Sequence, residues 1–484
     1  MLALVSGCKV GPDYHRPAAV GTNAIPQDYS GASGSNSLWK AAVPSAHLPH
    51  GSWWELFEDV ELARLESLAA ANSPELSGAL ARFEQARAQI DVSRAELFPQ
   101  IDAVPSYNRQ RTSFNEPENG HAAGQARTYN TFTLPFQAGW ELDLWGRVRR
   151  QVESARASAE ASADDLESTR LALQAELATD YFTLRALDRE YDVVIRTTET
   201  FTRSLELTIN RRKGGIATDL DVSLAETQLR SAEAELPALR LQRSRLLHAI
   251  ATLCGQPATG FIVAHSAPDK LLDPLVPPGL PSELLERRPD VAAAEQRMAS
   301  ANAQIGVAQS AFFPRIRLDG LAGLQSVSVS TWLEWPSRFW SIGPTIDLPV
   351  FTGGRNRGQL AVSKAAYQSA VASYRHTVLT AFQEVEDQLA AQQHLTAQIA
   401  AETSALEAAQ RTVGIANNRY KAGLVTYLEV ASAQSAALSL ERTVVQLQGQ
   451  KRIATVGLIK AIGGGWQADR TAENKEMQLR RAGF

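Results

Sequence analysis

The clearest pattern in the sequence is strict alternation of apolar and polar residues in two segments of extended chain. In residues 128–142 one side is apolar and the other side is polar, and the apolar side consists of Phe132, Leu134, Phe136, Ala138, Trp140 and Leu142. Residues 338–350 repeat the pattern, with Trp340, Ile342, Ile346, Leu348 and Val350 on the apolar side. Alternation with a period of two predicts β-strands that differ in polarity between their faces.

A second pattern predicts helices of unusual length. Residues 151–212 hold no Pro or Gly, and residues 359–420 hold only Gly414. Their apolar residues recur at alternating spacings of four and three, or in steps of seven, and such heptads are typical of coiled coils. Gly-containing breaks near 214 and 423 end the two segments. Each segment is expected to be followed by an antiparallel helix, at about 218–253 and 426–462.

The chain is built from two copies of one unit. Ser73–Pro99 matches Arg288–Pro314 at an offset of 215 residues, and Arg211–Val222 matches Arg419–Val430 at an offset of 208. Each copy is expected to run helix, strand, loop, strand, long helix, turn, helix, and its first helix is expected at about 60–97 or 282–312. The long loop of the first copy falls at Thr112–Arg127, which is rich in Asn, Gly, Pro and Glu.

These patterns divide the chain into segments. The predicted division is the end of a signal peptide with a lipobox (1–8), an extended segment (9–59), a first repeat (60–255), a Pro-rich connector (256–281), a second repeat (282–465) and a tail (466–484). Within the repeats, the strand–loop–strand parts are expected at 99–143 and 314–351, and the helical hairpins at 147–253 and 357–462.

Composition narrows the possible functions less than the patterns do. The 484 residues are 44% hydrophobic and 21% charged, with a net charge of −4, which are ordinary globular values and give no case for nucleic acid as a partner. No stretch approaches the roughly 18 apolar residues of a membrane-spanning helix. A barrel needs about eight strands, so four strands that enter a bilayer require several subunits to share one barrel. No catalytic motif of the Walker, HExxH, CxxC or GxSxG type is present, so an enzyme and a bound cofactor or metal are not expected.

The N-terminus suggests a lipid anchor. Val5-Ser6-Gly7-Cys8 resembles the bacterial lipobox, in which the cysteine thiol is acylated (a palmitate among its chains). Acyl chains on Cys8 would give durable anchoring, because each buried CH₂ contributes about 0.8 kcal/mol. The alternative is an ordinary apolar N-terminus with a buried cysteine.

Several short motifs together resemble a known family. They are Val10–Tyr14, Trp53-Trp54, the Phe-Pro pairs at 98–99 and 313–314, Asp143–Arg147, Phe351–Arg355 and Tyr420–Gly423. In order, spacing and duplication they resemble the TolC-like outer-membrane factors, of the NodT-type lipoprotein branch that serves resistance-nodulation-division efflux pumps. The resemblance implies an α+β membrane protein, a homotrimer whose chains share a 12-stranded outer-membrane β-barrel and a coiled-coil α-barrel in the periplasm.

The resemblance also implies a function and its partners. It implies a passive exit duct for small toxic compounds or drugs, working with a periplasmic adaptor and, through it, an inner-membrane transporter. By the same resemblance, Asp221, Tyr420 and Glu429 form a gate at the periplasmic tip, and Val425 and Ser432 depart from the family pattern there. The alternative for the two acids is that they are solvated first-turn residues favoured by the helix dipole.

The turns at the ends of the long helices are the candidate adaptor site, comprising Gly214, Gly215, Thr218, Ala422, Gly423 and Thr426. Two other functions remain possible at this stage. One is an exit duct for type I protein secretion, and the other is a coiled-coil lipoprotein that spans the envelope without conducting.

Overall fold

The computed structural model describes residues 9–18, 51–115, 126–266, 274, 276 and 287–464. The chain separates into two compact units, each assembled from several stretches of sequence. Unit 1 contains residues 1–17, 82–163 and 293–374, and unit 2 contains residues 18–81, 164–292 and 375–484. Cys8, the centre of the loop at 112–127, half of the connector at 256–281 and the tail at 466–484 lie outside the described residues.

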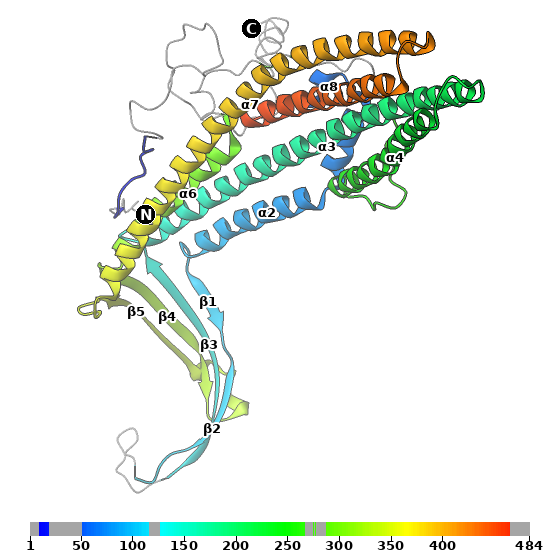
Figure 1. Cartoon of the computed structure of the whole chain (residues 1–484). Coiled ribbons are helices and arrows are strands. Elements are labelled where there is room, and N and C mark those ends of the chain that lie inside the picture. The colour runs from blue at the N-terminus through cyan, green and yellow to red at the C-terminus, as the bar shows by residue number, and fades with distance from the viewer. Residues whose placement is uncertain are drawn as a thin grey trace, which may run out of the picture. The chain divides into compact units, whose positions relative to one another are not determined.

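Unit 1 is built around one antiparallel sheet (Figure 1). Its strands in the described residues are β1 (Gln100–Ala103), β2 (Ser106–Arg111), β3 (Thr128–Leu142), β4 (Arg315–Ser326) and β5 (Arg338–Asp347). The order across the sheet is β1-β3-β4-β5, with β2 also paired to β3. The strands of the two repeats therefore meet at the β3–β4 ladder, which runs from the Phe132–Ser326 pair to the Leu142–Ile316 pair.

The register gives the sheet one apolar and one polar face, as the alternation predicts. Residues paired directly across antiparallel strands share a face. The apolar face carries Tyr107, Phe132, Leu134, Phe136, Trp140, Leu142, Leu324, Trp340, Ile342 and Ile346. The opposite face carries Asp102, Asn108, Gln137, Glu141, Arg317, Asp319, Ser341, Thr345 and Asp347. The apolar face is open in the single chain, because Trp340 is 74% exposed and Ile342 is 68% exposed.

The first strand of the first repeat is interrupted, which the sequence pattern alone does not predict. β1 ends at Ala103 and β2 begins at Ser106, with Val104 and Pro105 between them. Proline has no N–H to donate to a ladder, so it breaks the regular pairing. Val104 still donates to the carbonyl of Pro135 at 3.4 Å, and β1 and β2 follow one another along the same edge of β3.

A short N-terminal strap, Lys9–Pro17, is bound to the helices of unit 1. The helices that fall wholly or partly in this unit are α2 (Pro74–Ala95), α3 (Arg147–Lys213), α6 (Pro289–Ser310) and α7 (Arg355–Lys421), and the strap contacts the last three. The side chain of Arg150 on α3 is 1% exposed and donates to the carbonyls of Val10 and Gly11 at 3.1 and 3.0 Å. The same guanidinium lies 3.0 Å from the carboxylate of Asp13.

The second repeat completes the strap's binding site. Asn302 on α6 donates to the carbonyl of Pro12 at 2.9 Å, and Arg16 pairs with Glu295 at 3.0 Å. Gly11 has a φ of 99°, and a Cβ there would lie 2.5 Å from the Cα of Gly306. The strap therefore ties a helix of each repeat to the same short peptide.

Unit 2 contains two helical hairpins. The first joins α3 to α4 (Asp219–Leu253), and the second joins α7 to α8 (Tyr427–Ala461) (Figure 1). α3 and α7 each have 67 residues, and α4 and α8 each have 35. The bounds of the second pair follow those of the first at the offset found in the sequence, so the two tandem repeats are confirmed.

The core of unit 2 packs the beginning of the first repeat against these helices. The short 3₁₀ helix η1 (Trp53–Phe57) and α1 (Val60–Asn72) cover a cluster that includes Leu177, Phe182 and Ile250. The single helix expected at 60–97 is wrong, because α1 ends before Ser73 and α2 begins at Pro74. A residue that precedes proline is driven out of the helical region, and Ser73 has a ψ of 122°.

One buried acid in this core has no partner. Glu66 on α1 is 1% exposed, and neither carboxyl oxygen has a hydrogen-bond partner among the described residues. Removal from water disfavours the ionised form and raises the pKa of Glu66 to about 9. The side chain is therefore a neutral carboxylic acid at neutral pH.

We expect the strap to be released by the substitution Gly306→Ala. Its Cβ would lie 2.9 Å from the carbonyl oxygen of Val10, and overpacking of this kind costs about 1–3 kcal/mol. Trypsin cleavage after Lys9, followed by mass spectrometry, should be about tenfold faster than in wild type. The control is Gly358→Ala, where a Cβ meets nothing within 4 Å. Equal cleavage rates in both variants would contradict this role of the strap.

Glu66 should make the stability of the fold fall as pH rises. The folded pKa lies above the unfolded value, so the stabilisation is complete below pH 4.5 and is lost as pH rises toward 9. In that window the free energy of unfolding decreases by up to about 1.4 kcal/mol per pH unit. Glu66→Gln should flatten the fall of the melting temperature between pH 5 and 8, and the exposed Glu75→Gln should leave it unchanged. A wild-type slope in Glu66→Gln would show that this carboxyl does not titrate as described.

Candidate functional site

The turns between the long helices share one backbone design. After α3, the amide of Ile216 donates to the carbonyl of Arg211 at 2.8 Å, and the amide of Gly215 donates to that of Arg212 at 2.9 Å. After α7, Leu424 and Gly423 make the equivalent bonds to Arg419 and Tyr420. This is the Schellman ending of a helix, which needs a left-handed residue. Gly215 and Gly423 supply it, with φ values of 73° and 77°.

Each turn presents an exposed pair of aliphatic side chains. Ile216 and Leu220 are both 67% exposed in the first turn. At the repeat offset they correspond to Leu424 and Leu428, which are 71% and 55% exposed. The predicted tip residues Gly214, Gly215, Thr218, Ala422, Gly423 and Thr426 lie beside these pairs, so both turns combine a fixed backbone with an accessible apolar surface.

The carboxylate of Asp221 connects the two hairpins. It accepts hydrogen bonds from the amide and hydroxyl of Thr218 at 2.9 and 2.8 Å, closing a capping box at the start of α4. Its other oxygen accepts from the amide of Tyr427, the first residue of α8, at 3.3 Å. Partial burial alone would raise the pKa of Asp221, but these hydrogen bonds prevail and lower it. The group is an anion that bonds the beginnings of two helices.

Tyr420 lies inside the cluster that holds the helix ends together. It is 4% exposed, and its hydroxyl lies 3.4 Å from Oγ1 of Thr208 on α3. The guanidinium of Arg211 stacks over its ring at 4.8 Å and donates to the carbonyl of Lys421 at 3.0 Å. The ring of Tyr427 meets that of Tyr420 edge-on at 5.6 Å. Burial raises the pKa of Tyr427 to about 12, so its hydroxyl stays protonated.

The predicted gate residues are therefore only partly brought together. Asp221 and Tyr420 join through Tyr427, whereas Glu429 is exposed and lies 3.5 Å from Arg419. Sequence reasoning missed Arg211, Thr208 and Tyr427 as members of this cluster. The matching positions of Arg211 and Arg419 in the two repeats could have indicated that these arginines matter, because each lies at the end of a long helix. In the structure Arg211 contacts Tyr420, whereas Arg419 pairs with Glu429.

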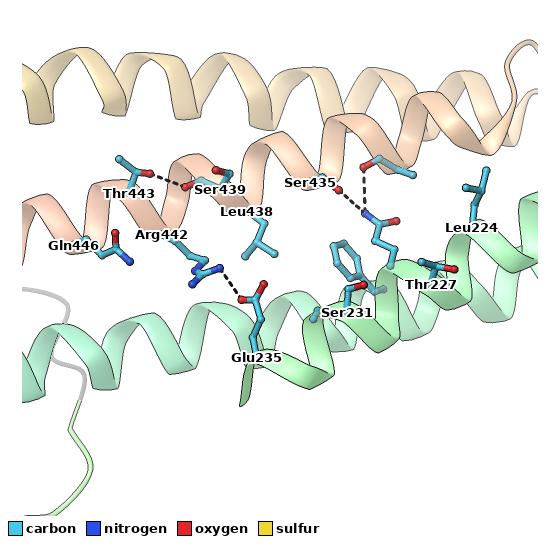
Figure 2. Close-up of a pocket in the computed structure, with 14 residues that line it drawn as sticks. Leu224, Thr227, Ser231, Glu235, Ser435, Leu438, Ser439, Arg442, Thr443 and Gln446 are labelled. Carbon is cyan, nitrogen blue, oxygen red and sulfur yellow. Dashed lines mark hydrogen bonds and ion pairs between the residues drawn. The ribbon is translucent and has the colours of Figure 1, made fainter. Parts of the chain in front are cut away.

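Beyond the turns, α4 and α8 border an open groove of about 610 Å³ (Figure 2). Its lining is rich in small side chains, among them Ser231, Ala232, Ser435 and Ser439. Arg442 on α8 lies at the groove and forms ion pairs at 2.7 Å with both Glu235 on α4 and Glu190 on α3. Figure 2 shows Arg442 and Glu235 pointing toward one another across the space between their helices.

No helix in the part of the chain that the structure describes is both long and apolar enough to cross a membrane. No group of three or more His, Cys, Asp or Glu side chains there is arranged to hold a metal ion.

Comparison with known proteins gives consistent results over most of the chain. The sequence profile described as "Outer membrane efflux protein" matches residues 65–256 and 280–464. Outer membrane protein OprJ of Pseudomonas aeruginosa is 34% identical over 475 residues, covering 97% of this chain and 96% of that protein. The toluene efflux pump outer membrane protein TtgC of Pseudomonas putida is 33% identical over 481 residues, covering 98% and 96%.

Solved structures resemble the fold equally well. A membrane protein from Pseudomonas aeruginosa superposes with a TM-score of 0.84 at 33% identity, covering 94% of this chain and all of that one. The outer-membrane channel OprN gives a TM-score of 0.83 at 30% identity, covering 95% of this chain and all of that one.

Proposed function

The chain belongs to the outer membrane efflux protein family, and we propose that three copies of it form one passive duct gated at its helical turns. As a member of this family it is the outer-membrane channel component of an efflux pump.

The two-faced sheet is the observation that carries the proposal. In the described residues its outer strands, β5 on one side and β1 with β2 on the other, each leave an edge without a partner strand. Unpaired backbone groups are costly in lipid, so a spanning sheet must close on itself. β1 and β2 follow one another along the same edge of β3, so one chain supplies four strand positions, which is too few to close a barrel. Three chains would give a barrel of about 12 strands. The apolar face would then meet lipid and the polar face would line a water-filled lumen.

The strap supports a lipid anchor at Cys8. A Cβ at Gly146 would lie 3.2 Å from the Cα of Lys9, so the strap begins beside the junction of β3 and α3. Cys8 directly precedes Lys9 in the chain. Acyl chains on Cys8 would therefore enter the membrane that the sheet spans.

The tip cluster supports the gate. Asp221 bonds to the amide of Tyr427, Tyr420 lies against Thr208, and Arg211 bonds to Lys421, so each contact joins the first hairpin to the second. Separation of the hairpins at the turns would break all of them. In a ring of three chains, Asp221 and the exposed Glu429 would also place carboxylates near the opening, where they favour cations.

The cargo we propose is small toxic compounds or drugs. This rests on the efflux pump relatives, of which TtgC is described as serving toluene efflux. The comparisons favour efflux over the type I secretion duct and the non-conducting lipoprotein considered from the sequence.

The gate is tested by the double substitution Asp221→Ala with Tyr420→Phe. We expect higher single-channel conductance in planar bilayers, because contacts between the hairpins are lost. Asp221→Asn keeps an acceptor oxygen but removes the charge, so it should reduce cation preference with a smaller rise in conductance. Glu226→Ala, which removes an exposed acid farther along α4, is the control. Wild-type conductance and selectivity in the first two variants would exclude these residues from the gate.

The turns are the proposed docking surface for the periplasmic adaptor, through which the inner-membrane transporter would be reached. Their exposed aliphatic pairs recur in both repeats, so a ring of chains would offer the same surface at each turn. The backbone is fixed there by the left-handed glycines.

Docking is tested by photo-crosslinking from single cysteines at Ile216 and Leu424. We expect adducts with the adaptor from both, because each position is exposed at a turn. Ser439→Cys in the groove of Figure 2 serves as the comparison, and the buried Cys254 should not be labelled. Adducts from Ser439→Cys without adducts from the turns would place docking on the rod instead.

A further inference from the structure

Gln228 on α4 joins the two hairpins at a second level, beyond the turns. Its Nε2 donates to the carbonyl of Ala431 at 3.2 Å and to the hydroxyl of Ser435 at 3.4 Å, both on α8. Its Oε1 accepts from the hydroxyl of Tyr427 at 3.2 Å. One amide thus bonds to successive turns of α8, while Tyr427 also connects to Asp221 through its main chain.

The groove between α4 and α8 is bounded by two different kinds of contact. Gln228 bonds to Ser435 at the level nearer the turns. Figure 2 shows Glu235 and Arg442 farther along the groove. Between these levels the groove is lined by small side chains such as Ser231 and Ser439, and by Leu438, which packs against the cluster of Phe201, Leu229 and Ala232. α4 and α8 are therefore joined by polar contacts at these two levels, with apolar packing at Leu438 between them.

The two contacts differ in strength. Arg442 pairs at 2.7 Å with Glu235 and with Glu190, which is 7% exposed, and Gln446 donates to Glu190 as well. Short charge-assisted bonds of this kind are about twice as strong as neutral ones. Removing Arg442 would leave the largely buried carboxylate of Glu190 without a cationic partner, which is strongly unfavourable. The bonds of Gln228 are neutral and between 3.2 and 3.4 Å long, so they are the contacts that give way first.

We propose that Gln228 is a releasable latch of the gate, and that the Arg442 ion pairs are the pivot about which α8 moves away from α4. The proposal rests on the gated duct proposed above and adds a positioning residue outside the turns. Release of Gln228 frees Tyr427, which contacts both Tyr420 and Asp221. The latch and the tip cluster therefore open together.

The latch is specific to this pair of helices rather than a feature of the repeat. At the offset of 208 residues, Gln228 corresponds to Ala436 and Tyr427 corresponds to Asp219. Alanine has no side-chain donor or acceptor, so the equivalent positions cannot form the same bond. The contact between Gln228 on α4 and Tyr427 on α8 therefore has no equivalent between Ala436 on α8 and Asp219 on α4.

The first test compares Gln228→Leu with wild type in planar bilayers. Losing neutral hydrogen bonds of this kind shifts a two-state equilibrium about fivefold to tenfold, so the mean current should rise about fivefold. Tyr427→Phe removes only the hydroxyl and should give a smaller rise, with less than additive effect when the two are combined. Gln242→Leu, an exposed glutamine on the same helix, should keep the wild-type current. A wild-type current in Gln228→Leu would overturn the latch.

The second test locks the latch in the assembled protein. Cysteines at Gln228 and Ser435, joined by a cleavable thiol crosslinker, should lower the mean current at least fivefold, and cleavage of the linker should restore it. Cys254 is buried and free, so it does not compete for the reagent. Unchanged current in the crosslinked channel would show that α4 and α8 move as one body, which also overturns the proposal.

The currents of the two sets of variants distinguish the gate residues from the latch. If Asp221→Ala with Tyr420→Phe raises the current but the Gln228 variants do not, the gate stands and the latch is wrong. If only the Gln228 variants and the crosslink change the current, the latch stands and the gate residues must be reassigned. Heat-modifiable oligomers on gels confirm that each variant has assembled before its current is compared.

Discussion

An amphipathic sheet with free edges is the constraint on which the rest of the structure depends. Its apolar face carries exposed tryptophan and isoleucine, and its outer strands in the described residues leave hydrogen-bonding groups unpaired. Lipid would cover the apolar face, but unpaired backbone groups at the two edges are costly in lipid, whereas a barrel shared among copies would pair them. The same sheet contains strands of both repeats, so duplication supplies the four strand positions that each chain contributes.

In the proposed duct, the ends of the helical repeats would form the gate. Both hairpins end in the same Schellman turn, but the contacts around the turns are not the same in the two repeats. Asp221 caps its own helix and bonds to the next, whereas its counterpart Glu429 remains at the surface with Arg419. Arg211 stacks on Tyr420, and Gln228 has a counterpart that cannot hydrogen-bond through its side chain. These contacts between the hairpins exist because the repeats have diverged at these positions.

Much of this architecture follows from the sequence, for identifiable reasons. Period-two alternation predicts the two faces of the sheet, and the scarcity of Pro and Gly predicts the long helices, as the structure has them. The breaks at Ser73-Pro74 and Val104-Pro105 were predictable from proline chemistry but were masked by the stronger patterns around them. Contacts to main-chain groups, such as Arg150 to the strap and Asp221 to the amide of Tyr427, could not be predicted, because every residue offers such groups and only the fold selects the partner.

The central claim is that copies of this chain complete one barrel and one duct. Native mass spectrometry of the protein extracted from membranes in mild detergent tests it most directly. The account predicts a particle of three chains of 52.5 kDa each, with no free single chain while the sheet remains folded. A folded single chain that retains its sheet would contradict the account, because the edges of the sheet would then be stable without partner strands.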